Sequence, residues 1–109
     1  MALYCGIDLH SNNCWVSIID EDRKVVRERK TRNDLGEILG FLEPHRAELE
    51  GVVVESTFNW YWLVDGLADA GFRMHLANTW ACKQYEGLKY ADDRHDARWL
   101  AHMLSLGIL

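Results

Sequence analysis

The sequence predicts an α/β fold in which helices flank a mixed sheet, with the element order βββαβαβαα. Three observations support this class. Two apolar segments near the start are typical of strands, and the second of them is rich in aromatic and β-branched residues. The uninterrupted apolar run at 51–54 is typical of a strand covered on both faces, and three other stretches place apolar residues at helical spacing. With 109 residues, of which 49% are hydrophobic, the chain has the size of one small domain, residues 1–109, with one core.

The first three strands are expected to form an antiparallel meander. Residues 2–8 form an apolar run that ends in a charge, and residues 14–19 form a second apolar run. The acidic residues 20–22 suit a solvated turn, and residues 24–30 follow as a strand with an exposed, charged rim. Short turns between these segments favour pairing of each strand with the next.

A helix follows the meander and is expected to pack on the sheet. Its apolar positions, 35, 38, 39 and 42, keep helical spacing. Asn33 or Asp34 can cap the start of this helix, and Pro44 lies just beyond its expected end.

The strand that ends at Glu55 begins a strand–helix–strand unit. Thr57 or Asn59 can open the helix, and Gly71 stands where a C-terminal cap belongs. Residues 72–76 then form another strand. The short links predict a right-handed crossover between parallel strands.

Two helices complete the chain. One spans residues 80–85, and the other spans about 92–106. The polar residues of the last helix form only a narrow stripe of Arg98, His102 and Ser105, so this helix needs burial on two sides. We expect the apolar flank around Trp99, Met103 and Leu106 to be covered by a second copy of the chain in the fragment, and hence in a homo-oligomer, and by more chain in the intact protein. Because the sequence stops without a polar terminus, we also expect a fragment of a longer protein.

Composition and charge narrow the functional classes. No apolar run approaches the ~18 residues that span a bilayer, and the start lacks a signal peptide, so we expect a cytoplasmic protein without membrane contact. Cys5, Cys14 and Cys82 are odd in number and lack the paired spacing of a zinc site, which predicts reduced, buried or half-buried thiols. The net charge of −5 argues mildly against a free-standing nucleic-acid binder, but acids gathered to hold cations would also lower the sum.

Four acids stand at positions that favour a shared site. Asp8 and Glu55 each end an apolar strand, and Asp93 and Asp96 lie three residues apart at the start of a helix, on one face. The carboxyl ends of strands are where ligands gather in α/β sheets. Carboxylate oxygens suit Mg²⁺ or Mn²⁺, which assist phosphoryl transfer in nucleases and transposases. Unrelated surface acids are the alternative, but an unpaired acid buried at the end of an apolar strand would be costly.

Several segments together resemble a known family. They are Gly6-Ile7-Asp8, Val54-Glu55-Ser56-Thr57 with the aromatic residues 60–62, Gly71-Phe72 with residues 75–78, and Asp93-Arg94-His95-Asp96-Ala97 with residues 98–101. These segments are similar to those of the DEDD transposases of the insertion-sequence-110 (Piv/MooV-type) family, over nearly the whole chain. The family usually has a glycine where this chain has Phe58, a departure that leaves the acid in place.

The resemblance implies a ribonuclease-H-like (RuvC-like) N-terminal catalytic domain. It implies that Asp8, Glu55, Asp93 and Asp96 hold Mg²⁺ (or Mn²⁺) for DNA strand cleavage and transfer. It further implies a C-terminal domain with a nucleophilic serine, and a guide (bridge) RNA that joins donor and target DNA. The family's Asp-x-x-Asp-Ala spacing selects Asp93 over Asp92, which stands where a helix cap belongs.

Two other functions stay open at this point. Gly6-Ile7-Asp8-Leu9 also resembles the opening of actin-like ATPases and sugar kinases, but residues 10–13 contain no glycine that would let backbone N–H groups approach a phosphate. The other alternative is a catalytically silent module that binds RNA, DNA or sister subunits. Binding of Mg²⁺ or Mn²⁺ would favour the enzyme, and binding of ATP the kinase-like class.

Five further residues have two interpretations each. His10 could contact a phosphate or metal, although a polar loop residue is the more common case. Tyr61 and Trp62 could stack on bases, but we expect partial burial of both. Lys83 and Lys89 could meet phosphates, with a solvated lysine as the alternative.

Overall fold

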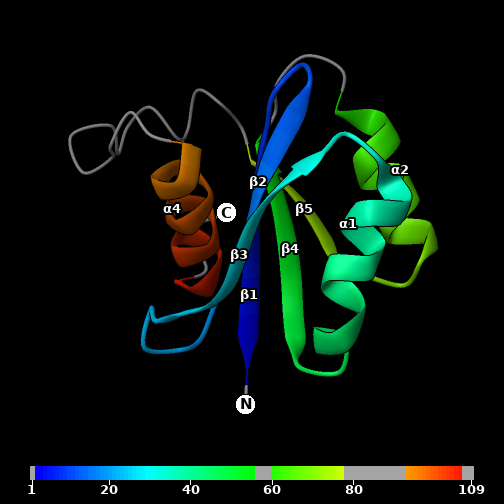
Figure 1. Ribbon diagram of the computed structural model, residues 1–109. Coiled ribbons are helices and arrows are strands. Elements are labelled where there is room, and N and C mark those ends of the chain that lie inside the picture. Colours follow the sequence, from blue (N-terminus) through cyan, green and yellow to red (C-terminus); the bar gives the residue numbers. More distant parts are fainter. Residues whose placement is uncertain (1, 56–59, 78–92, 107–109) are drawn as a thin grey trace.

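Five strands form one mixed sheet in the order β3-β2-β1-β4-β5 (Figure 1). The computed structural model describes residues 2–55, 60–77 and 93–106, and only the backbone of residues 77, 93–96 and 99 within these ranges. The strands are β1 (Leu3–Leu9), β2 (Asn13–Ile19), β3 (Val25–Arg32), β4 (Leu49–Glu55) and β5 (Met74–Ala77). The first three pair antiparallel, whereas β4 pairs parallel with both β1 and β5. The predicted meander and the parallel strand–helix–strand unit are therefore confirmed, with β1 as the middle strand.

Helices cover both faces of this sheet. Figure 1 shows α1 (Leu35–Leu42) and α2 (Tyr61–Asp69) on one side and α4 (Asp93–Ser105) on the other. A short 3-10 helix, η1 (Glu43–His45), continues α1 through Pro44. Within the described residues, no helix has the length and apolar character needed to cross a membrane.

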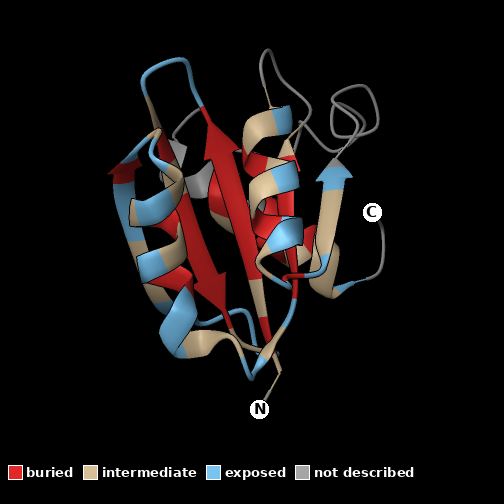
Figure 2. Cartoon of the chain, turned by 90° about the vertical axis from the view of Figure 1, so that its right-hand side faces the viewer, coloured by how far each residue is buried: buried red, intermediate tan, exposed pale blue. Residues whose placement is uncertain are grey.

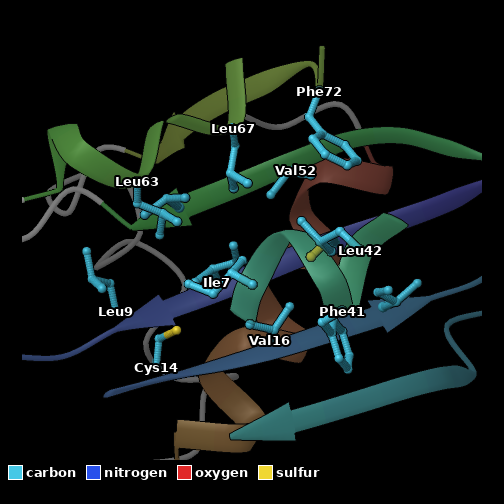
Figure 3. Packing of buried hydrophobic residues seen from close by; sticks show 14 of the residues in the cluster. Ile7, Leu9, Cys14, Val16, Phe41, Leu42, Val52, Leu63, Leu67 and Phe72 are labelled. Carbon is cyan, nitrogen blue, oxygen red and sulfur yellow. The ribbon is translucent and has the colours of Figure 1, made fainter. Parts of the chain in front are cut away.

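The main core lies between the sheet and the helices α1 and α2. Alternate residues of β1, Cys5, Ile7 and Leu9, point into it, because side chains of a strand alternate between its faces. Leu63 and Leu67 of α2 contribute to the same cluster, as Figure 3 shows. The interior strands are buried along most of their length, in contrast to the exposed outer faces of the helices (Figure 2).

The cysteines confirm the prediction of buried, reduced thiols where the structure describes them. Cys5 and Cys14 are buried and free. Burial raises the pKa of both thiols, and the neighbouring Cys14 adds to the effect on Cys5. Cys82 lies outside the described residues.

The first two helices differ in how well their predicted ends agree with the structure. Asp34 caps α1, where its carboxylate accepts hydrogen bonds from the N–H groups of Gly36 at 2.9 Å and Glu37 at 3.3 Å. The start of α2 was predicted too early, because the helix begins at Tyr61 with Trp60 as a cap that makes no side-chain bond.

The predicted start of β5 is also wrong by two residues. Gly71 follows α2 with a φ of 97°, a left-handed conformation that suits glycine. The N–H of Phe72 then donates to the carbonyl of Leu67 at 3.1 Å. Residues 71 and 72 thus complete the end of the helix, and the strand begins after them, at Met74.

Two side-chain predictions for the helices need correction. Tyr61 is 55% exposed rather than half-buried, although Trp62 packs against the core as expected. Met103 is fully buried against the sheet and cannot belong to an apolar flank covered by a second copy, whereas Leu106 is 59% exposed. The predicted helix at 80–85 lies outside the described residues.

Candidate functional site

Asp8 and Glu55 lie next to each other at the carboxyl ends of two parallel strands. The last pair of the ladder between β1 and β4 joins Ile7 to Val54, and the two acids are the next residues on each strand. Neighbouring strands are about 4.8 Å apart, and residues in register point to the same face. Both carboxylates therefore leave the sheet on the face that α4 covers.

The Asp8 carboxylate is buried and has a defined partner. Asp8 is only 3% exposed, while Glu55 is half-buried. Asp8 Oδ2 accepts a hydrogen bond from His10 Nε2 at 2.9 Å. A carboxylate removed from water needs such donors, since burial of an unpaired charge is very unfavourable.

His10 is held in place by the hairpin that joins β1 to β2. Its N–H donates to the carbonyl of Asn13 at 2.9 Å, and its own carbonyl accepts from Asn33 Nδ2 at 2.7 Å. The interpretation of His10 as a polar loop residue is incomplete, because its ring bonds to Asp8. The two-residue spacing between Asp8 and His10 across the end of a strand was the only sequence signal of this contact.

Gly6 allows α4 to lie directly on β1. A Cβ at this position would collide with the carbonyl oxygen of Ala97 and would stand 2.7 Å from the nitrogen of Ala101. Ala97 and Ala101 are fully buried in this contact. The small side chains on both elements therefore bring the helix backbone close to the strand beside Asp8.

The direction of α4 places its first turn at the end of the sheet where the two acids lie. Near the end of the helix, Leu104 faces Gly51, at the start of β4, where an added Cβ would stand 3.4 Å from Leu104 Cδ2. One and two turns earlier, Ala101 and Ala97 face Gly6, further along the sheet. The helix thus runs antiparallel to β1 and β4, and Asp93 begins it beside their carboxyl ends (Figure 1).

An ion pair fixes α4 to the outer strands as well. Arg98 donates two hydrogen bonds to Glu28 of β3, from Nε at 2.8 Å and from Nη2 at 2.5 Å. Glu28 also accepts from the Ser17 hydroxyl at 3.3 Å. The register explains this arrangement, since Gly6, Ser17 and Glu28 are opposite one another on three adjacent strands. The sequence indicated Arg98 as part of a polar stripe but gave no sign of its partner.

The structure thus brings together part of the predicted acidic cluster. Asp8 and Glu55 are adjacent, and Asp93 and Asp96 lie in the first turn of α4, although their side chains are outside the described part. Among the side chains that are described, no group of three or more His, Cys, Asp or Glu residues surrounds a common point. Three further residues, Lys83, Lys89 and Asp92, fall in a segment that the structure does not describe.

Comparison with known proteins identifies relatives of this arrangement. The model of the DEDD-type transposase family of insertion sequence 110, described as "Transposase", matches residues 5–107. No curated protein matches the chain.

Three solved structures have a similar fold. RuvC of T. thermophilus, in complex with a Holliday junction substrate, is 18% identical with a TM-score of 0.65, and the match covers 93% of this chain and 90% of RuvC. The large terminase nuclease from thermophilic phage G20c is 12% identical with a TM-score of 0.58, over 97% of this chain and 55% of the nuclease. A ROK family transcriptional regulator, a homolog of the E. coli MLC protein, is 14% identical with a TM-score of 0.57, over 79% of this chain and 30% of the regulator. These similarities confirm the ribonuclease-H-like (RuvC-like) mixed sheet predicted from the sequence.

Proposed function

Because the chain belongs to the DEDD transposase family of insertion sequence 110, we propose that it is the N-terminal catalytic domain of a DNA transposase, cleaving and transferring DNA strands with the help of divalent metal. The observation that carries this proposal is the adjacent placement of Asp8 and Glu55, beside the first turn of α4. DNA is the proposed substrate, as it is for transposases as a class.

The residues present fit a hard divalent cation. Two carboxylates on adjacent strands would repel each other unless a positive charge lay between them, and their oxygens are ligands that Mg²⁺ and Mn²⁺ accept. The backbone of Asp93 lies about one turn before Ala97, which faces Gly6 of β1, so the start of α4 is near the strand ends that carry Asp8 and Glu55. When bound to Asp8, Glu55, Asp93 and Asp96, such an ion would stabilise negative charge that develops on a phosphate.

The protein's own residues would prepare this site. His10 holds one oxygen of Asp8 and so fixes the orientation of the carboxylate. Glu55 is less buried than Asp8 and would face the incoming phosphate backbone. The Gly6 contact and the ion pair of Arg98 with Glu28 hold α4 in position, which a site built from a helix and two strands requires.

We infer the remaining parts of the reaction from the resemblance to the family. A C-terminal domain with a nucleophilic serine would complete strand transfer, and a guide RNA would pair donor with target DNA. The domain 1–109 would then supply the acidic half of a composite reaction centre, working in a homo-oligomer.

Calorimetric titration with Mn²⁺ tests the site. We expect weak binding by the protein and its loss in Asp8→Asn, because the remaining acids cannot neutralise the ion. Asp22→Asn, in the exposed turn between β2 and β3, is the matched control and should bind as the unmodified protein does. Undiminished binding by Asp8→Asn would overturn the proposal. ATP binding without metal binding would instead support the kinase-like alternative, and binding of neither would support a silent module.

A second pair of variants tests which acid of the last helix takes part. Asp93→Asn is expected to lose Mn²⁺ binding, whereas Asp92→Asn should keep it, since Asn caps a helix nearly as well as Asp. The reverse result would move the assignment by one residue.

A further inference from the structure

A row of residues leads from the candidate site across the sheet to its edge. Asp8 is opposite Trp15 of β2, and Trp15 is opposite Lys30 of β3. Residues directly opposite each other in antiparallel strands point to the same face, so all three share the α4 face. β3 is an edge strand, and two strand spacings of about 4.8 Å place the backbone of Lys30 roughly 10 Å from that of Asp8.

The end of β3 nearest to the site is strongly basic in a chain whose net charge is −5. Arg29, Lys30 and Arg32 occupy three of four consecutive positions, and all are exposed. Arg32 pairs with Glu37 at 3.2 Å. Among the described residues, neither Arg29 nor Lys30 has an ion-pair partner.

The acid closest in sequence to these cations does not neutralise them. Glu28 is engaged by the guanidinium of Arg98, and only 15% of its side chain is exposed. The positive charge of Arg29 and Lys30 is therefore available to a ligand, and Lys30 is on the same face as Asp8.

Phosphate is the chemistry that this charge fits. Lysine and arginine contacts to phosphates supply most of the affinity for nucleic acid and set its position without reading sequence. Charged side chains on an edge strand also deter pairing with other sheets, and that role alone would leave nucleic-acid binding unchanged. Lys30 differs from the other basic residues of the β2–β3 hairpin in its position. It lies on the face of the sheet that α4 covers, at the same level as Asp8.

We propose that Lys30 binds the sugar-phosphate backbone of the DNA substrate and directs it past Trp15 to the acids Asp8 and Glu55. This inference rests on the proposed function and adds a substrate-binding surface to it. The surface contacts phosphates, so it contributes affinity and register and no base preference.

The experiment compares Lys30→Gln with Lys24→Gln in the intact protein. Lys24 is also exposed but lies in the turn at the opposite end of β3, so both changes remove one positive charge from the same hairpin. Binding of a fluorescent DNA duplex is measured by anisotropy in EDTA at several salt concentrations. Loss of one phosphate contact lowers the slope of log Kd against log salt by about 0.9, so between about 50 and 200 mM salt the Kd of Lys30→Gln should change about 3.5-fold less than that of the unmodified protein.

Lys24→Gln should keep the original slope, and Lys30→Arg should restore it. Equal slopes for the two Gln variants would overturn the inference. So would absence of DNA binding by the unmodified protein at about 50 mM salt, or tighter binding of an RNA duplex of the same sequence.

Failure of this surface is separable from failure of the metal site. The metal site is tested by Mn²⁺ titration without DNA, and the Lys30 surface is tested by DNA binding in EDTA without metal. An effect of Lys30→Gln without any Mn²⁺ binding would refute the proposed catalytic site and leave the DNA surface standing. Mn²⁺ binding with no effect of Lys30→Gln would do the opposite.

Discussion

Replacement of Gly6 by alanine is the most direct test of how α4 is held on the sheet. Gly6 lies in β1 without a positive φ, so the added methyl group causes no backbone strain of its own. Its effect comes from contact with the carbonyl of Ala97, the nitrogen of Ala101 and the Cβ of Leu100, the last at 3.0 Å. Two of these atoms belong to helix backbone and cannot rotate away, so the whole helix must move.

The expected loss of stability is large for one methyl group. Overpacking of a filled core costs about 1–3 kcal/mol, and a contact with helix backbone belongs at the upper end of that range. A loss of about 3 kcal/mol corresponds to a fall in melting temperature of roughly 12–24 °C for a domain of this size. Displacement of α4 should also weaken Mn²⁺ binding, because the helix carries Asp93 and Asp96.

Thermal unfolding followed by circular dichroism measures this effect. Gly40→Ala is the matched control, since Gly40 is exposed in α1 and an added Cβ meets nothing within 4 Å. That change should stabilise the protein by about 0.5–1 kcal/mol, because alanine is the better helix former. If Gly6→Ala unfolded at the temperature of the unmodified protein, the close approach of α4 to β1 would be wrong.

Three further predictions concern the packing of the helices. A double-mutant cycle with Arg98→Gln and Glu28→Gln, measured by urea unfolding, should give a coupling free energy of about 1 kcal/mol. This value is at the upper end for partly exposed ion pairs, because the pair is bidentate. A coupling free energy near zero would show that the pair does not hold α4. Burial, with a smaller contribution from Arg23, lowers the pKa of His102 below 6.5. As pH falls, the unfolded chain therefore takes up the proton first, so the stability contributed by His102 is present above about pH 6.5 and is lost below it. His102→Gln should make the melting temperature less dependent on pH between about pH 5 and 7. An unchanged pH profile would contradict this prediction. Leu67→Ala removes a fully buried side chain of α2 and should cost about 2–5 kcal/mol in chemical unfolding, so a loss below about 1 kcal/mol would exclude a tightly packed contact.

The candidate site shows which of its features could be predicted from local sequence. Asp8 and Glu55 follow apolar runs, and a run of that kind indicates a buried strand wherever it occurs. The sequence could not say that β1 and β4 are neighbours, because the strand order depends on how the crossover packs. Adjacent placement of the two acids came from that pairing and its register.

Sequence by itself determined the elements, since hydrophobic periodicity, capping residues and turn residues act over a few positions. It established the α/β class, the meander, the buried thiols Cys5 and Cys14, and the acids at the ends of strands. Tertiary structure alone decided that His10 bonds to Asp8 and that Arg98 pairs with Glu28, 70 positions away. Tertiary structure also decided that α4 packs against Gly6. These contacts depend on register between strands and on the distance of a helix from the sheet, and both are set by packing of the whole core rather than by any local pattern.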